Sequence, residues 1–157
     1  VSEWQPDAPL GADGLPALRD FPVAVLLPQR MSTNGTRLMV GGAYEERIQL
    51  VDLAAGTALR PVDFPGPSAL GYMRTRPVMW AASTVNGLRL WDQRSGRVLM
   101  TISFLPNRRY VVVAPDGRYD TNMGPDSENF RWLIPDQPFR SLAPPTLMRD
   151  YYEPQLI

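Results

Sequence analysis

The sequence contains neither cysteine nor histidine, and these two absences exclude several kinds of chemistry. A zinc site built from cysteine and histidine, a cysteine nucleophile and a Ser-His-Asp triad each need at least one of them. A disulfide is impossible as well, so cysteine usage leaves the redox compartment open. We therefore expect no cofactor, and no catalysis by an imidazole or a thiolate within this chain.

Lysine is also absent, so arginine supplies every basic residue. Basic and acidic residues balance at 16 each, and the arginines are spread from Arg19 to Arg149 without forming a patch. Nucleic-acid-binding proteins instead concentrate positive charge on one surface. We predict that nucleic acid is not a partner.

The sequence also lacks an apolar run of the roughly 18 residues that a membrane-spanning helix needs. No secretory signal pattern is visible either. We predict no transmembrane segment. The chain begins with Val1 rather than methionine, and we expect it to be a piece of a longer polypeptide.

Long helical patterns are scarce, whereas proline (17 residues) and glycine (12 residues) are plentiful. This composition favours short strands joined by turns, and a hydrophobic content of 44% is enough for a core. Repeated prolines and glycines predict an irregular lead-in over residues 1–22. The apolar residues 23–27 then predict a short buried strand.

Two stretches of the chain repeat each other at an interval of 40 residues. Apolar, small, aspartate and glycine positions match without a gap. The matching segments are 38–42 with 78–82, 48–52 with 88–92, and 56–59 with 96–99. Internal repeats of this length are typical of stacked or radial architectures.

Each repeat has the pattern of a strand, a tight turn and another strand. Ile48 and Leu50 alternate with a polar residue, which predicts a half-buried strand that ends at Asp52. Gly56, four residues after that aspartate, suits a left-handed turn position, and the aspartate side chain can cap the turn amides. The same pattern recurs at Asp92 and Gly96. The next strands are expected at residues 57–64 and 97–104.

The triplet Leu90-Trp91-Asp92 resembles the end of a WD repeat, and Leu50-Val51-Asp52 is its degenerate copy. In the WD-repeat family each unit is a blade of four antiparallel strands, and the blades surround a central channel. The resemblance implies an all-β partial β-propeller with two WD40-like blades over residues 23–105. Residues 106–135 are expected to add last strands or a partial blade.

Strand patterns at residues 109–113 and 130–134 flank a strong turn signal, Asp116-Gly117. Residues 136–157 predict an irregular proline-rich tail, with a short helix over residues 146–152.

Three motifs follow one another in the last third of the chain, namely residues 115–120 (PDGRYD), 130–132 (FRW) and 151–156 (YYEPQL). Their order resembles the junction in bacterial multidomain proteins that couple a WD40 propeller to a caspase-like peptidase (peptidase C14). The resemblance implies that a parent protein carries such a peptidase. The peptidase's catalytic histidine and cysteine have no positions in this chain.

An alternating oxygen-rich run is a weak calcium candidate. Pro125 stands where the turn glycine of such a loop belongs, and Arg131 stands where its bidentate glutamate belongs. We favour a solvated loop over a calcium site. The candidate ligands are Asp120, Asn122, Asp126 and Glu128, with Gly124 between them.

Carboxylate pairs could serve glycoside hydrolysis, namely Asp116 with Asp120 or Asp150 with Glu153. A turn at Asp116 and a helix end at Asp150 explain these residues without catalysis. Trp132, Tyr151 and Tyr152 are candidates for an interaction face, and packing between blades and tail is the alternative. That alternative also covers Trp80, Trp91 and Tyr110.

These patterns predict a non-catalytic protein-interaction or scaffolding segment. Its partner is expected to be another protein or an adjacent domain of the same polypeptide. The alternative is a regulatory segment of a caspase-like cysteine peptidase whose catalytic domain lies outside this chain. A carboxylate-based hydrolase or lyase is a third hypothesis, because fold does not determine function.

Overall fold

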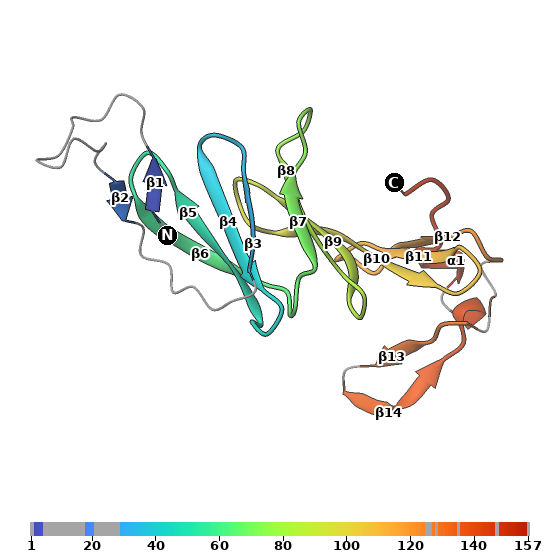
Figure 1. Ribbon diagram of the computed structural model, residues 1–157. Helices are drawn as coiled ribbons and strands as arrows, with labels where there is room; N and C mark the ends of the chain where they lie inside the picture. The colour runs from blue at the N-terminus through green and yellow to red at the C-terminus, as the bar shows by residue number, and fades with distance from the viewer. Residues whose placement is uncertain are drawn as a thin grey trace, which may run out of the picture. The chain divides into compact units, whose positions relative to one another are not determined.

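The computed structural model describes residues 2–4, 18–20, 29–124, 127, 129–134, 136–146 and 148–156 (Figure 1). This part of the chain is all-β with antiparallel pairing, apart from two short helical turns. It divides into two units, Val1–Asn86 with Asp92–Gly96, and Gly87–Trp91 with Arg97–Ile157. The elements are β1 (Ser2–Trp4), β2 (Leu18–Asp20), β3 (Gln29–Thr33), β4 (Arg37–Gly42), β5 (Arg47–Asp52), β6 (Thr57–Asp63), β7 (Ala69–Tyr72), β8 (Val78–Ser83), β9 (Gly87–Asp92), β10 (Val98–Leu105), β11 (Arg109–Val113), β12 (Tyr119–Thr121), β13 (Trp132–Ile134), β14 (Gln137–Leu142), η1 (Pro144–Thr146) and α1 (Met148–Tyr151).

The first unit is built around a four-stranded meander, β3-β4-β5-β6. Its core lies on the two central strands, where Met39, Val40, Ile48 and Val51 are fully buried. Ile48 and Leu50 are buried and alternate with the half-buried Gln49, as predicted, while Val51 adds a buried residue on the opposite face. Burial of such apolar surface is the main driving force for this sheet.

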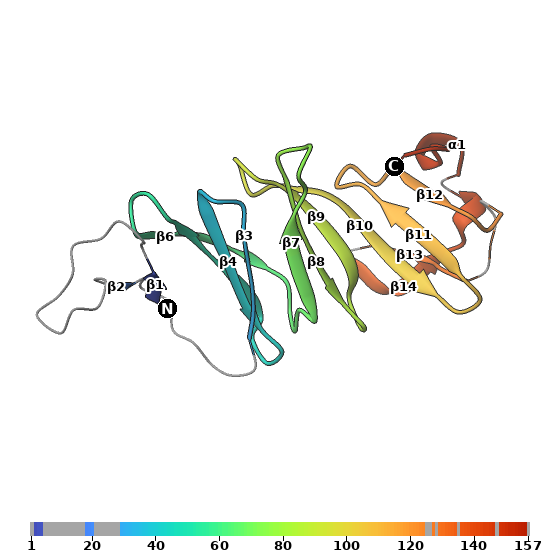
Figure 2. The same ribbon diagram turned by 45° about the horizontal axis from the view of Figure 1, so that its top comes forward.

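The hairpin β7–β8 belongs to the same unit, and β7 lies against β3 (Figure 2). Glycine makes this approach possible. A Cβ at Gly41 would lie 2.8 Å from Pro67 Cγ and 3.4 Å from Leu70 Cδ2. Glycine at this position of β4 therefore allows Pro67 and Leu70 to lie close to the strand.

The turns after β5 and β9 repeat each other as predicted. Asp52 Oδ1 accepts a hydrogen bond from the amide of Ala55 at 2.8 Å, and Asp92 Oδ1 accepts one from the amide of Ser95 at 2.7 Å. Gly56 and Gly96 have φ of 66° and 69°, in the left-handed region that favours glycine.

The 40-residue interval extends to a strand pair that residue patterns did not reveal. β3 begins at residue 29 and β7 at residue 69. Their sequences, QRMST and ALGY, lack the apolar alternation of a half-buried strand. Only the resemblance to a four-stranded blade implied them.

The second unit contains the paired strands β9, β10, β11 and β12 and the hairpin β13–β14. β10 pairs with β9 on one edge and with β11 on the other, where Phe104 opposes Tyr110. β11 and β12 therefore extend the strands of the repeat, whereas β13 and β14 form a separate two-stranded sheet. No sheet in the described part closes on itself, so the all-β class is confirmed and the propeller stays a prediction.

The two ends of the chain contain more strand than expected. Within the expected irregular lead-in, β1 pairs with β2; within the expected irregular tail, β14 pairs with β13. β14 tolerates Pro138 because its described pairing is with β13 alone, and a proline can occupy an edge strand. The helix α1 falls inside the predicted stretch 146–152. The strand predicted at residues 23–27 lies outside the described residues.

We predict that Gly87→Ala destabilises the protein far more than Gly35→Ala. Both glycines have positive φ, which costs an alanine about 1–2 kcal/mol. A Cβ at Gly87 would also overlap the carbonyl oxygen of Ile102, whereas one at Gly35 meets nothing within 4 Å. Urea denaturation followed by tryptophan fluorescence should show a loss of about 3 kcal/mol or more for Gly87→Ala. Equal losses for the two variants would contradict this packing.

We predict that Asp92 makes stability depend on pH. Hydrogen bonds from the side chain and amide of Ser95 lower the pKa of Asp92. Its contribution is therefore present above the unfolded-state pKa and is lost as pH falls through the folded-state pKa. The free energy lost in Asp92→Asn should shrink between about pH 7 and about pH 3. The same change at the exposed Asp136 serves as the control. A pH-independent loss for Asp92→Asn would refute the role of its charge.

Candidate interaction pocket

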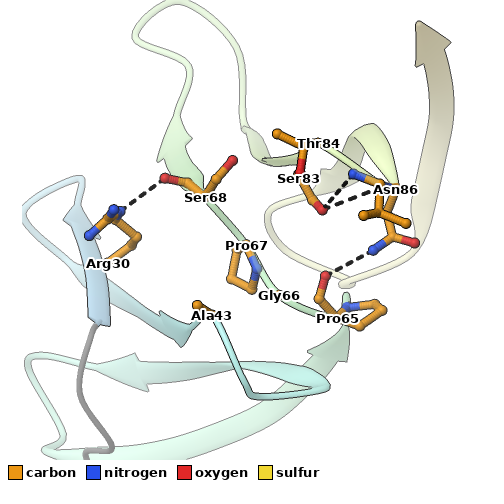
Figure 3. A pocket seen from close by; sticks show the side chains of 10 residues that line it. Arg30, Ala43, Pro65, Gly66, Pro67, Ser68, Ser83, Thr84 and Asn86 are labelled. Atoms are coloured by element: carbon orange, nitrogen blue, oxygen red, sulfur yellow. Dashed lines mark hydrogen bonds between the residues drawn. The ribbon is translucent and has the colours of Figure 1, made fainter. Parts of the chain in front are cut away.

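Three loops of the first unit meet at one end of its strands. They are the segment between β6 and β7, the turn between β4 and β5, and the turn between β8 and β9 (Figure 3). They enclose a pocket of about 480 Å³, which we call the loop pocket. Its lining residues are Arg30, Ala43, Pro65, Gly66, Pro67, Ser68, Ser83, Thr84, Val85 and Asn86.

Hydrogen bonds hold these loops in place around the pocket. Asn86 Nδ2 donates to the carbonyl of Pro65 at 3.0 Å, and Arg30 Nε donates to the carbonyl of Ser68 at 2.9 Å (Figure 3). Ser83 Oγ accepts from the amide of Val85 at 3.2 Å. The side chains thus fasten one loop to another, so the pocket is preformed rather than assembled by a ligand.

The chemistry of the loop pocket suits binding. Its walls include the prolines 65 and 67, and Arg30 is the only charged residue among the described residues that line it. Ser83 Oγ accepts hydrogen bonds from backbone amides of its own turn, and no lining residue can serve as its general base. Two large apolar side chains stand exposed on the same turns, Tyr44 at 86% and Val85 at 87%.

Sequence reasoning did not select the loop pocket. The segment Pro65-Gly66-Pro67-Ser68 could have indicated it, because prolines and glycine in this order are a strong turn signal. In the folded chain this turn contacts residues that are far apart in the sequence. Gly66 has φ of 58°, and a Cβ there would lie 3.0 Å from the carbonyl oxygen of Ala43. Only glycine fits this close crossing of two loops without strain.

The calcium candidates that the structure describes make structural hydrogen bonds. Asp120 accepts from the amides of Thr121 at 2.7 Å and Gln155 at 3.0 Å. Asn122 Oδ1 accepts from the amide of Tyr110 at 2.9 Å. Asp126 and Glu128 lie outside the described residues. Across the part of the chain that is described, no three histidine, cysteine, aspartate or glutamate side chains gather as a metal site.

Three of the four carboxylates in the proposed hydrolytic pairs bond to arginine or to backbone amides. Arg118 stands between two acids, with Nε 2.7 Å from Asp116 Oδ2 and Nη1 2.6 Å from Glu153 Oε2. The amide and then the side chain of Arg118 lower the pKa of Asp116. A general acid needs the opposite shift. Asp120 instead bonds to Gln155, and Asp150 is exposed on α1.

The three aromatic candidates Trp132, Tyr151 and Tyr152 lie in one cluster of the second unit. Ring centroids are 5.3 Å apart for Tyr119 and Trp132, 5.4 Å for Tyr119 and Tyr152, and 6.4 Å for Trp132 and Tyr151. Phe130 completes the cluster at 5.4 Å from Tyr119. Tyr119 is fully buried, whereas the three candidates are half-buried. Their contacts are those of packing in a small core.

The end of the chain is attached to the same cluster. Tyr152 forms a parallel bridge with Tyr119, and the amide of Glu153 donates to the carbonyl of Tyr119 at 2.9 Å. Together with the bond from Gln155 to Asp120, these contacts run along β12. The PDGRYD and YYEPQL motifs, which sequence analysis singled out, therefore contact each other directly.

No family model matches the sequence, and no curated protein matches it. Among solved structures, Kuenenia stuttgartiensis hydrazine synthase is 13% identical, with a TM-score of 0.41 over 54% of this chain and 29% of that one. A computationally designed protein, Ika4, is 19% identical, with a TM-score of 0.39 over 58% and 62%. A eukaryotic initiation factor is 12% identical, with a TM-score of 0.40 over 60% and 31%. The chain spans less than two thirds of the length of each of these three structures. Structural similarity at this level assigns neither a fold family nor a function.

Among the described residues, no helix is long and apolar enough to cross a membrane.

We predict that Tyr119→Ala lowers the free energy of unfolding by about 3–5 kcal/mol, the usual cost of removing a buried aromatic ring. Tyr119 contacts Phe130, Trp132 and Tyr152, so the near-ultraviolet circular dichroism of the aromatic residues should also weaken. Phe139→Ala is the matched control, because that ring is fully exposed. Its effect should stay within about 0.5 kcal/mol. A small effect at Tyr119 would mean that the cluster does not hold the tail.

Proposed function

We propose that this chain is a non-catalytic protein-interaction module, a segment of a WD40-like propeller whose partner docks at the loop pocket. The observation that carries the proposal is a preformed pocket with apolar walls, flanked by the exposed Tyr44 and Val85. Exposed aromatic and aliphatic side chains beside a pocket are typical anchors of protein interfaces.

The propeller part of the proposal is supported by the repeat. Matching strands and matching aspartate–glycine turns recur 40 residues apart, and the matching strands β3 and β7 lie against each other. Successive blades of a propeller place their first strands side by side near the channel. Loops at the ends of such strands are where partners bind.

The kind of partner follows from the lining of the pocket. Rigid proline walls accept an apolar side chain, while Ser68, Thr84 and Asn86 can hydrogen-bond to the backbone of the partner. A space of about 480 Å³ suits one or two such side chains. We infer that the ligand is an extended peptide segment with an apolar anchor.

The test is selection of peptides from a displayed random library on the 157-residue chain. The variant Val85→Asp serves as the counter-selection target. Selected peptides should carry a recurrent apolar residue, and Val85→Asp or Tyr44→Ser should weaken their binding by about tenfold or more, as for an interface anchor. Phe104→Ser removes a side chain that is equally apolar and 65% exposed, and it should leave affinity unchanged.

Two results would contradict the proposed function. One is the absence of any enriched peptide. The other is a set of binders that tolerate both loop-pocket variants as well as they tolerate Phe104→Ser. Circular dichroism of each variant shows whether folding is preserved, because all three side chains are exposed.

The alternative function, regulation of a caspase-like peptidase in the same polypeptide, rests on the tail motifs. One structural observation favours treating them as a unit: Arg118 of the first motif pairs with Glu153 of the last. A parent reading frame that encodes a peptidase with a catalytic histidine and cysteine would support this alternative. A parent without such a domain would refute it.

A further inference from the structure

A second pocket lies at the other end of β7, where that strand turns into β8. Its volume is about 620 Å³, and we call it the arginine pocket. Its lining residues are Thr33, Asn34, Tyr72, Met73, Arg74, Thr75, Arg76, Pro77 and Gln93. All of them belong to the first unit, and none of them lines the loop pocket.

Two arginines give this pocket its charge. Arg74 and Arg76 are both exposed in the β7–β8 turn, and none of the described residues that line the pocket carries a carboxylate. Neither arginine forms an ion pair with any acid in the described part of the chain. Asp92 adjoins the lining residue Gln93 in sequence, and its carboxylate accepts hydrogen bonds from the amide and hydroxyl of Ser95. Within the described residues, the guanidinium groups of Arg74 and Arg76 have no ion-pair partner.

A third arginine is fixed close by. Arg37 Nη1 donates a hydrogen bond to the carbonyl of Gln93, and the charge of Arg37 acts on the hydroxyl of Tyr72. The amide of Gln93 in turn donates to the carbonyl of Pro77 at 2.8 Å. These bonds hold Gln93 and Pro77 together in the wall of the pocket.

Tyr72 presents a hydroxyl with no partner. The oxygen is buried and has no hydrogen bond within the described residues. Burial raises the pKa of Tyr72, and Arg37 offsets this only in part, so the hydroxyl stays protonated at neutral pH. A buried donor without an acceptor is costly, and a ligand oxygen at this position would remove that cost.

We propose that the arginine pocket binds an acidic peptide segment of a protein partner. Arg74 and Arg76 would hold its aspartate or glutamate carboxylates, and the Tyr72 hydroxyl would donate to one of them. Arginine suits this task because its planar guanidinium matches a carboxylate with two parallel hydrogen bonds. The net charge of zero and the small number of arginines here do not suit nucleic acid, which needs a long basic surface. This proposal does not depend on the loop pocket.

The experiment measures fluorescence anisotropy of a fluorescein-labelled hexaglutamate peptide titrated with the 157-residue chain. Hexaglutamine is the uncharged probe for comparison. Hexaglutamate should bind and hexaglutamine should not. Raising the salt from about 0.1 M to about 0.5 M should weaken binding, because exposed charges are screened.

Charge-matched variants separate this site from the overall charge of the chain. Arg74→Gln with Arg76→Gln should lower the affinity for hexaglutamate by about tenfold or more. Arg60→Gln with Arg131→Gln removes the same charge at exposed positions outside the pocket, and it should change affinity by less than about twofold. Tyr72→Phe should lower affinity by about fivefold, the effect of one lost hydrogen bond.

Three outcomes would contradict the proposal. No binding of hexaglutamate refutes it directly, and equal losses in the two double variants would show attraction to charge in general. If Tyr72→Phe binds hexaglutamate with unchanged affinity, the Tyr72 hydroxyl does not contact the peptide. The double variant Arg74→Gln with Arg76→Gln should still select the same peptides at the loop pocket. That result would show that the two sites bind independently.

Discussion

The close approach of Pro67 to the backbone of β4 at Gly41 is the constraint on which the first unit depends. A side chain at Gly41 would overlap Pro67 and press against Ile48 and Leu70. With glycine there, the segment between β6 and β7 lies against the meander, and β7 lies against β3. Packing of this density allows little adjustment, so the position of β7 is set by a few contacts.

Once β7 is placed, both of its ends acquire neighbours from other loops. At its start, Ser68 receives a hydrogen bond from Arg30 of β3, and Asn86 reaches the carbonyl of Pro65. At the end of β7, the positive charge of Arg37 acts on the hydroxyl of Tyr72. The guanidinium of Arg37 also donates a hydrogen bond to the carbonyl of Gln93. The two pockets therefore lie at opposite ends of the same strand, β7. Their chemistry differs, because one set of loops is rich in proline and the other contains arginine.

In the second unit, residues near the end of the sequence complete a small aromatic core around Tyr119. Tyr119 contacts the rings of Phe130, Trp132 and Tyr152, which come from two segments that lie apart in the sequence. Arg118 and Asp120, on either side of it, bond to Glu153 and Gln155. Polar contacts on both flanks thus hold the last residues along β12, so the aromatic side chains serve stability first.

Local patterns alone determined much of this protein. The alternation around Ile48 and Leu50, the aspartate–glycine turns at Asp52 and Asp92, and the strand at residues 109–113 all depend on near neighbours, so they could be predicted. Tertiary structure decided the rest. β3 and β7 have no strand-like alternation, and pairing with β4 and β8 makes them strands. The loop pocket and the aromatic cluster each join residues more than thirty positions apart, such as Arg30 with Ser68 and Tyr119 with Tyr152. Spacing in a sequence carries no information about such meetings, because they exist only once the chain has packed.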